Sequence, residues 1–444
     1  MKRNVILLSF MAFVINLGFG AAAPLIPFLL LSYEGLITEL PEKIGKIPNA
    51  PEIAFQISTI MAAFMLTRAF LARYFGRLSD SIGRKKLIIV GLIFYSILAF
   101  LYTLAASWIH LLLIRAFQGV ASAMVWPIAE AMIADSVRID ERGRYMGWYM
   151  TFSNVSFFIG PAIGVILYKF AAFYLGWGIP EVFIFPFYIL FALAIFSIFI
   201  SLFTKETVFP KRKKQRIRKP LADEISETPT IILPPHISRS IMVIYIMGFA
   251  NGIAMGLVAP VTQLFVIQYI TADPAALGAL STISGFIGFL INYPSGYISD
   301  LFGRRRVVIL GQITLRISTF FLPFIRTFEQ LLMIYSLRSA AFNIMSPAYR
   351  ALQADLVPIK MRGKIFGTVQ TLFNFGAATT PLGGLLYQLA SKCQFNILGY
   401  IVPGVAISFW LSTMIGIFTT ILFALYVHEP TKEEKELISE HSIS

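Results

Sequence analysis

The sequence predicts an all-α membrane protein with twelve transmembrane helices in two six-helix bundles. Three observations support this fold class. Of the 444 residues, 57% are hydrophobic and only 14% are charged, whereas soluble domains are about half apolar and about a quarter charged. Many apolar runs reach the ~20 residues needed to cross roughly 30 Å of hydrocarbon. The second half of the chain also repeats motifs of the first at one constant offset.

The apolar runs, divided at their polar breaks, give the positions of the twelve spans. We expect helices, because backbone groups in lipid must be bonded within their own segment and the runs are too long and continuous for barrel strands. The first run continues beyond the length of a signal peptide, so we expect it to be a span. The spans are residues 5–31, 54–75, 87–107, 109–137, 145–168, 183–203, 240–268, 277–297, 307–325, 330–356, 364–390 and 401–427.

The basic residues set the expected orientation. With the N-terminus inside, 26 of the 37 Lys and Arg residues fall in inside segments and 5 in outside segments. This bias follows the positive-inside rule. It predicts a multi-pass protein of the plasma membrane with both termini cytoplasmic, and it accounts for the net charge of +14 without nucleic acid.

Polar segments divide the chain into four parts. Residues 1–203 form an N-terminal six-helix bundle, 204–239 a basic and Pro-rich cytoplasmic linker, 240–427 a C-terminal six-helix bundle, and 428–444 a cytoplasmic tail. The linker contains KRKKQRIRKP, which either contacts anionic lipid headgroups or serves only as a solvated tether.

A shift of 220 residues superimposes the two bundles without a gap. Six spans return the chain to the inside, so the halves have the same orientation and are related by a pseudo-two-fold axis along the membrane normal. Such halves can rock around a central cavity. The matching positions include Gly76 with Gly296, Asp80 with Asp300, Gly83 with Gly303, Arg84 with Arg304, Asp135 with Asp355 and Pro161 with Pro381.

The stretch GRLSDSIGRKK resembles the signature between helices two and three of the major facilitator superfamily, and GYISDLFGRRR resembles its weaker second copy. The resemblance covers essentially the whole chain. It implies the superfamily's fold and a latch that closes the inner side when a transporter faces outward. Positive-inside topology with turn glycines is the alternative, but it does not explain the repeated Asp–Gly–Arg. The latch residues are Gly76, Asp80, Gly83, Arg84, Asp135, Asp300, Arg304 and Asp355.

Two further stretches resemble motifs of the same superfamily. LLLIRAFQGVASA places Arg115 on the fourth span, and FFIGPAIG resembles the antiporter motif of the fifth span through Gly160, Pro161 and Gly164. In the second motif Val165 replaces the final glycine. The resemblance implies efflux, although Gly-Pro bends also occur in other membrane helices.

Glu130 is the one carboxylate that we place well inside the membrane. Charged groups at this depth are costly and are functional candidates by default. Arg68 and Arg350 should lie at similar depth, and Arg350 corresponds to Glu130 under the 220-residue shift. Burial favours the neutral acid and a nearby guanidinium favours the carboxylate. Glu130 is therefore either a proton-coupling site or half of a permanent structural bridge with Arg68.

Polar and aromatic side chains recur at helical spacing on the fourth and tenth spans. In the family that the sequence resembles, these spans line the cavity. The predicted substrate cavity comprises Arg68, Arg115, Gln118, Trp126, Arg338, Phe342, Tyr349 and Arg350. The excess of arginine favours anionic, zwitterionic or neutral substrates.

We therefore expect a secondary active transporter that works by alternating access and exports amphipathic organic compounds or drugs in exchange for protons. The first alternative is an uptake carrier or facilitator for a small metabolite such as an organic anion or sugar. A second is a membrane receptor that does not transport. The chain lacks a phosphate-binding Gly-Lys-Ser/Thr loop and a metal-spaced His or Cys cluster, so we expect no enzyme activity, cofactor or metal. Its partners should be substrate, protons and the lipid bilayer, with no nucleic acid, and we expect a monomer.

Overall fold

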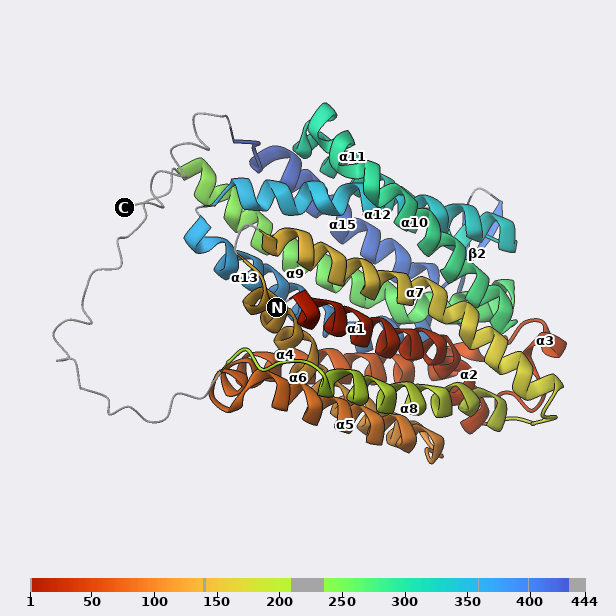
Figure 1. Cartoon of the computed structure of the whole chain (residues 1–444). Helices are drawn as coiled ribbons and strands as arrows, with labels where there is room; N and C mark the ends of the chain where they lie inside the picture. Colours follow the sequence, from red (N-terminus) through yellow and green to blue (C-terminus); the bar gives the residue numbers. More distant parts are fainter. Residues whose placement is uncertain (1, 139–140, 209–234, 358, 398, 431–444) are drawn as a thin grey trace.

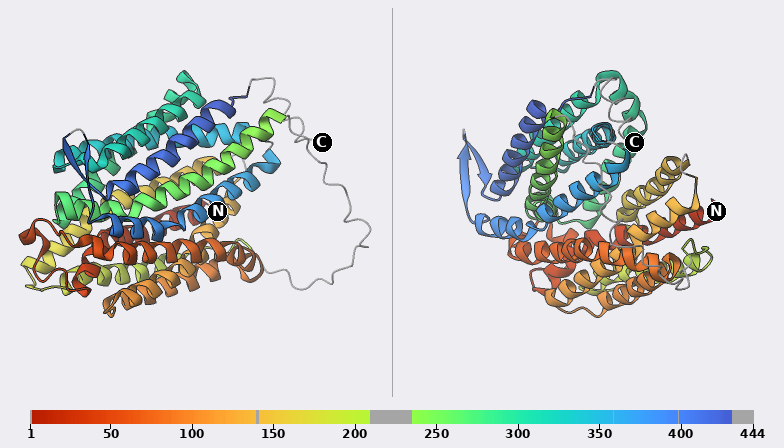
Figure 2. Two further views of the ribbon diagram at one scale, coloured as in Figure 1. Left: turned by 180° about the vertical axis from the view of Figure 1, so that it is seen from behind. Right: turned by 90° about the vertical axis from the view of Figure 1, so that its left-hand side faces the viewer.

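The computed structural model describes residues 2–138, 141–208, 235–357, 359–397 and 399–430 (Figure 1). Most of the predicted linker and tail lies outside these residues. Long helices lie side by side in two groups, coloured red to yellow-green and green to blue (Figure 2). We call the end at which α1 begins, marked N, the inner end, and the opposite end, which carries α3, the outer end (Figure 1).

The N-terminal half holds six long helical segments. The first is α1 (Lys2–Ala22) continued by the 3₁₀ turn η1 (Ala23–Leu25) and α2 (Ile26–Tyr33), and it is followed by the short α3 (Pro41–Ile44) and η2 (Ala50–Ile53). The others are α4 (Ala54–Ile82), α5 (Arg84–Thr103), α6 (Trp108–Ser136), α7 (Arg142–Phe173) and α8 (Glu181–Leu202).

The C-terminal half repeats this order. It contains α9 (Pro235–Phe265) with the π-helix η5 (Val266–Ile270), α10 (Pro274–Phe302), α11 (Arg304–Phe321) with η6 (Leu322–Phe324), α12 (Phe328–Asp355), α13 (Ile359–Ala377), α14 (Thr380–Ala390) and α15 (Ala406–Tyr426). A short antiparallel hairpin, β1 (Gln394–Ile397) with β2 (Tyr400–Pro403), precedes α15.

Helices of the two halves pack in equivalent pairs. In the N-terminal half α1 packs on α7, α4 on α6 and α5 on α8; in the C-terminal half α9 packs on α13, α10 on α12 and α11 on α15. Each packed pair of the N-terminal half therefore has its counterpart in the C-terminal half, in the same order along the chain. The halves meet mainly through α4 with α14 and α7 with α10.

A helix or helix pair lies at each of the twelve predicted spans. Ten helical segments within the described residues are long and apolar enough to cross a membrane. The remaining two positions hold α12, which carries Arg338 and Arg350, and the α13–α14 pair. The expected single span 364–390 is broken after Ala377. A new helix begins at Thr380 with Pro381 in its first turn, where the missing N–H of proline costs nothing. The last span begins at Ala406 rather than 401, because residues 400–403 pair with β1.

The halves are joined at the outer end. Gly384 of α14 packs directly on the backbone of Ala54 in α4, and Gly278 of α10 approaches Pro161 and Val165 of α7. These glycines leave no room for a side chain, so the helices of opposite halves touch closely. The structure is therefore in a state closed at its outer end.

Candidate functional site

Tight glycine turns at the inner end join α4 to α5 and α10 to α11. Gly83 has φ +106° and Gly303 has φ +85°, a region that residues with a Cβ rarely adopt. Gly76, in contrast, lies inside α4, and no atom lies within 4 Å of the place that a Cβ would take there. The turn itself begins after Ile82, and the part of Gly76 in the latch stays a prediction.

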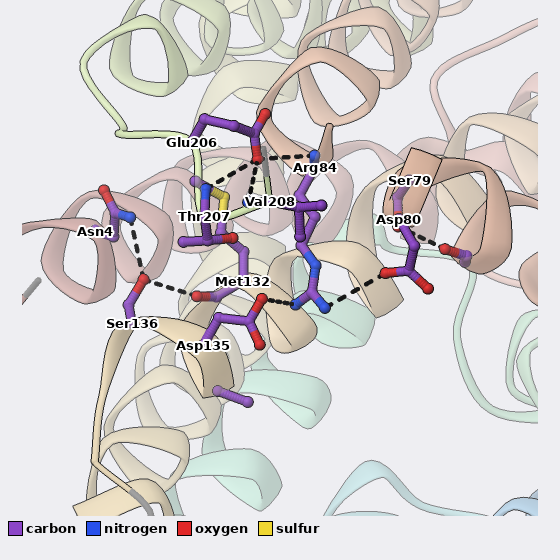
Figure 3. Close-up of polar contacts among 12 residues, drawn as sticks. Asn4, Ser79, Asp80, Arg84, Met132, Asp135, Ser136, Glu206, Thr207 and Val208 are labelled. Atoms are coloured by element: carbon purple, nitrogen blue, oxygen red, sulfur yellow. Dashed lines mark hydrogen bonds and ion pairs between the residues drawn. The ribbon is translucent and has the colours of Figure 1, made fainter. Parts of the chain in front are cut away.

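Arg84 is the first residue of α5 and holds two carboxylates (Figure 3). Its guanidinium lies 2.7 Å from Asp135 Oδ2 at the inner end of α6 and 3.5 Å from Asp80 Oδ1 in the last turn of α4. The Asp80 side chain is 64% exposed and that of Asp135 is 32% exposed. The Asp135 contact is thus the better shielded of the two.

The second half repeats this arrangement. Arg304, the first residue of α11, pairs with Asp355 of α12 and lies 3.7 Å from Asp300 of α10. In both halves the pairs join helices of one bundle. They do not cross between the bundles, so in this outer-closed state they brace each half internally.

Glu206, to which no sequence motif pointed, caps the same turn. Its carboxylate accepts a hydrogen bond from the backbone nitrogen of Arg84 at 2.9 Å (Figure 3). It accepts a second from the backbone nitrogen of Lys85 at 3.0 Å. A carboxylate at a helix N-terminus satisfies free N–H groups and suits the helix dipole. A Cβ on Gly83 would lie 2.6 Å from Glu206 Oε2, so the glycine also makes room for the cap.

The chain leaving α8 is fastened to other helices. Lys85 Nζ donates to Leu202 O at 2.6 Å. The Asn4 amide of α1 bonds both the N–H and the C=O of Lys205, each at 2.8 Å, and donates to Ser136 Oγ at 3.1 Å. These bonds connect α1, α5, α6 and the end of α8.

Glu429, after α15, is the counterpart of Glu206. It accepts from the backbone nitrogens of Arg304 (3.4 Å) and Arg305 (3.3 Å). These bonds are longer than those of Glu206. Each half therefore ends with a glutamate that caps its own third long helix.

The predicted antiporter motif lies where α7 crosses α1. A Cβ on Gly160 would collide with the backbone of Gly20, and one on Gly164 with the backbone of Ala21. Pro161 is buried between them and approaches Gly278 of the other half. The motif thus brings α1 and α7 into backbone contact beside the junction of the halves.

Glu130 lies on α6, five residues before Asp135, and Arg350 lies on α12, five residues before Asp355. Both are therefore about 7.5 Å from the same end of equivalent helices. Arg68 of α4 and Arg350 both act electrostatically on Glu130, although they belong to opposite halves. Arg68 and Arg350 are exposed, and within the described residues Glu130 forms no ion pair. This geometry contains no direct Glu130–Arg68 bridge.

The remaining members of the predicted cavity in the N-terminal half bond within that half. Arg115 donates to Gln118 Oε1 at 2.7 Å, and its guanidinium lies 5.7 Å from the centre of the Phe64 ring. Trp126 Nε1 donates to Tyr95 OH at 3.1 Å. Gln118 is buried, so these side chains brace the bundle in this state.

In the C-terminal half, some of the predicted cavity residues contact their own half and others are exposed. Arg338 donates to Thr319 Oγ1 of α11, beside Arg316, which donates to Asn251 Oδ1 at 2.6 Å. Tyr349 packs near Phe423 of α15. Phe342 is 53% exposed and Arg350 is also exposed. Of the predicted cavity residues, Arg68, Phe342 and Arg350 are thus the exposed ones.

Within the part of the chain that the structure describes, no cluster of His, Cys, Asp and Glu is placed to hold a metal ion.

Comparison with known proteins agrees with this architecture. The family profile of the Major Facilitator Superfamily matches residues 8–242 and 244–443. Multidrug resistance protein 2 of Bacillus subtilis is 27% identical over 407 residues, 90% of this chain and 93% of that protein. Multidrug resistance protein MdtG of Proteus mirabilis is 27% identical over 414 residues, 91% and 93% of the two chains.

Two solved structures share the fold. A point mutant of the nucleoside transporter NupG superimposes with a TM-score of 0.63 at 10% identity, covering 96% of this chain and 100% of its own. The human organic anion transporter MFSD10 gives a TM-score of 0.62 at 17% identity, covering 95% and 99%. These relatives are transporters rather than enzymes, and the chain belongs to the Major Facilitator Superfamily as a multi-pass membrane transporter.

Proposed function

We propose that this transporter exports amphipathic organic compounds in exchange for protons by alternating access. The multidrug resistance relatives and the glycine-proline contact between α7 and α1 support export. The structure, closed at its outer end, corresponds to one of the two states that such a cycle requires.

The relationship of Glu130 to the two halves carries the proposal. Glu130 and its symmetry mate Arg350 hold equivalent positions on α6 and α12 of the two halves, and Arg68 and Arg350 are both within electrostatic range of Glu130. An ionised Glu130 attracts Arg350 and favours approach of the halves at this depth. A proton on Glu130 removes that attraction. Protonation can thus bias the equilibrium between the two states, which is what coupling requires.

The test is flux in proteoliposomes with a set pH gradient, using ethidium and 1-naphthoate as probes. Glu130→Gln should abolish the acceleration by a pH gradient while leaving slow exchange. Glu329→Gln, at the exposed outer end of α12, is the matched control and should behave as wild type. Proton-driven flux that survives in Glu130→Gln would eliminate Glu130 as the proton carrier.

The exposed arginines favour a second candidate, uptake of an organic anion together with a proton. An anion that binds Arg68 and Arg350 competes with the Glu130 carboxylate, so it binds best when Glu130 is protonated. Anion and proton then move in the same direction. Inward accumulation of 1-naphthoate at acidic external pH, with no outward pumping of ethidium, would favour this function over export.

We place the inner end of the protein in the cytoplasm of a plasma membrane, because basic residues are concentrated there. The protein would act as a monomer embedded in lipid. Lys43 and Lys46, at the outer end, should therefore react with an impermeant amine reagent added outside intact cells. Failure of both to react would reverse the orientation.

A further inference from the structure

The segment between α2 and α4, residues 34–53, forms a strap across the outer end of the molecule. It belongs to the N-terminal half and is held there at two points. Gln56 donates to Glu34 Oε1 at 3.2 Å, and Tyr168 of α7 donates to Glu42 Oε2 at 2.6 Å. The strap therefore moves with the N-terminal half.

The middle of the strap is bonded to the C-terminal half. Two backbone bonds join it to η5 and the residues that follow η5: Ile47 N–H donates to Ile267 O at 3.1 Å, and Ala272 N–H donates to Gly45 O at 2.8 Å. Gln268 of the π-helix donates to Pro48 O at 3.2 Å. Backbone bonds of this kind form a short, defined contact between the halves.

A further bond joins the strap to α14, whose Gln388 donates to Glu52 O at 3.2 Å. Within the C-terminal half, Tyr387 OH donates to Gln268 Oε1 at 2.9 Å and so holds the side chain that bonds Pro48. Ile47 is only 3% exposed. Since an exposed loop would not need this burial, the strap is part of the packed junction. π-helical turns often occur at functional positions, and η5 carries two of the strap's partners, Ile267 and Gln268.

We propose that the strap is the outer gate of the transporter: its middle part must leave η5 and α14 before the outer end can open. The inference rests on the alternating-access part of the proposed function and is independent of substrate and coupling ion. Because Gly45, Ile47 and Pro48 bond the other half while Glu34 and Glu42 bond their own, opening separates the strap from the C-terminal half only.

Ser58 offers a reporter for this opening. It lies on α4, is fully buried and contacts Gly384 of α14, so it is covered while the halves are closed at the outer end. In a Cys393→Ser background, Ser58→Cys should react slowly with an impermeant maleimide added to the outer face of right-side-out vesicles. Adding Ile47→Asp should speed this labelling about tenfold or more. Lys46→Asp, an exposed neighbour, should leave the rate unchanged.

Two milder variants guard against misfolding of Ile47→Asp. Gly45 has φ +78° and Gly35 has φ +69°, and neither has an atom within 4 Å of a Cβ position. Alanine therefore brings backbone strain at both positions without colliding with another residue at either. Gly45→Ala should increase Ser58→Cys labelling and Gly35→Ala should not. Labelling at the wild-type rate in both Ile47→Asp and Gly45→Ala would overturn the gate. Proton-driven flux that survives in Glu130→Gln would instead eliminate Glu130 as the proton carrier and leave the gate result standing.

Discussion

Glu206 caps the helix that begins at Arg84, with both carboxylate oxygens bonded to backbone nitrogens of its first turn. Through this contact the residues that follow α8 hold the start of α5, where the guanidinium of Arg84 binds Asp135. Glu206 thus binds the backbone of Arg84, and Asp135 binds its side chain.

Glu206→Ala should destabilise the protein, because it leaves N–H groups of α5 without their partner. Loss of a helix cap typically costs about 0.5–2 kcal/mol. Glu429→Ala should cost less, since its bonds are 3.3–3.4 Å long rather than 2.9–3.0 Å. Thermal unfolding of purified protein in detergent measures both. A larger loss for Glu429→Ala would contradict the ranking by bond length.

Asp135→Asn should destabilise the protein more than Asp80→Asn. Removing Asp135 leaves the guanidinium of Arg84, which is 13% exposed, without its shielded partner. We expect a cost of roughly 1–3 kcal/mol, between that of surface and fully buried pairs. Asp80 is 64% exposed and 3.5 Å away, so its replacement should cost about 0–1 kcal/mol. Equal shifts in melting temperature for the two variants would refute this assignment.

Gly164→Ala should destabilise the α1–α7 contact, because its Cβ would meet the Ala21 backbone, which cannot move aside. Overpacking of this kind costs about 1–3 kcal/mol. Gly147→Ala lies in the same helix with nothing within 4 Å, and it should be neutral or stabilise by about 0.5–1 kcal/mol. Melting temperatures that change equally for both variants would show that the contact with Ala21 does not decide the cost at Gly164.

Much of the fold was predictable because it depends on composition and repetition. Apolar runs of membrane-spanning length locate the helices, and the 220-residue repeat predicts equivalent packing in the two halves. The break between α13 and α14 was not predicted, although Pro381 two residues after Thr379 was a usable signal. The β1–β2 hairpin carries no apolar alternation long enough to distinguish it from the end of a span.

The candidate site was less accessible to sequence reasoning. Arg84 lies in the motif GRLSDSIGRKK, and Asp135 recurs as Asp355 under the same shift, so both could be named as latch residues. Glu206 and Glu429 could have been found from their positions just after the sixth and twelfth spans, but their offset of 223 differs from the 220 of the repeat. The direction in which Arg115 and Arg338 point depends on small rotations of packed helices, which helical spacing alone does not determine.

Two sets of contacts in this structure involve different residues. One set of hydrogen bonds and ion pairs braces each half internally, and the hydrogen bonds of the strap join the two halves. Glu206, Glu429 and the two arginine clusters stabilise one bundle each, whereas the strap bonds connect two bundles that separate in the proposed transport cycle. Evolution can therefore adjust the speed of the transport cycle through a handful of outer-end positions without endangering the assembly of either bundle.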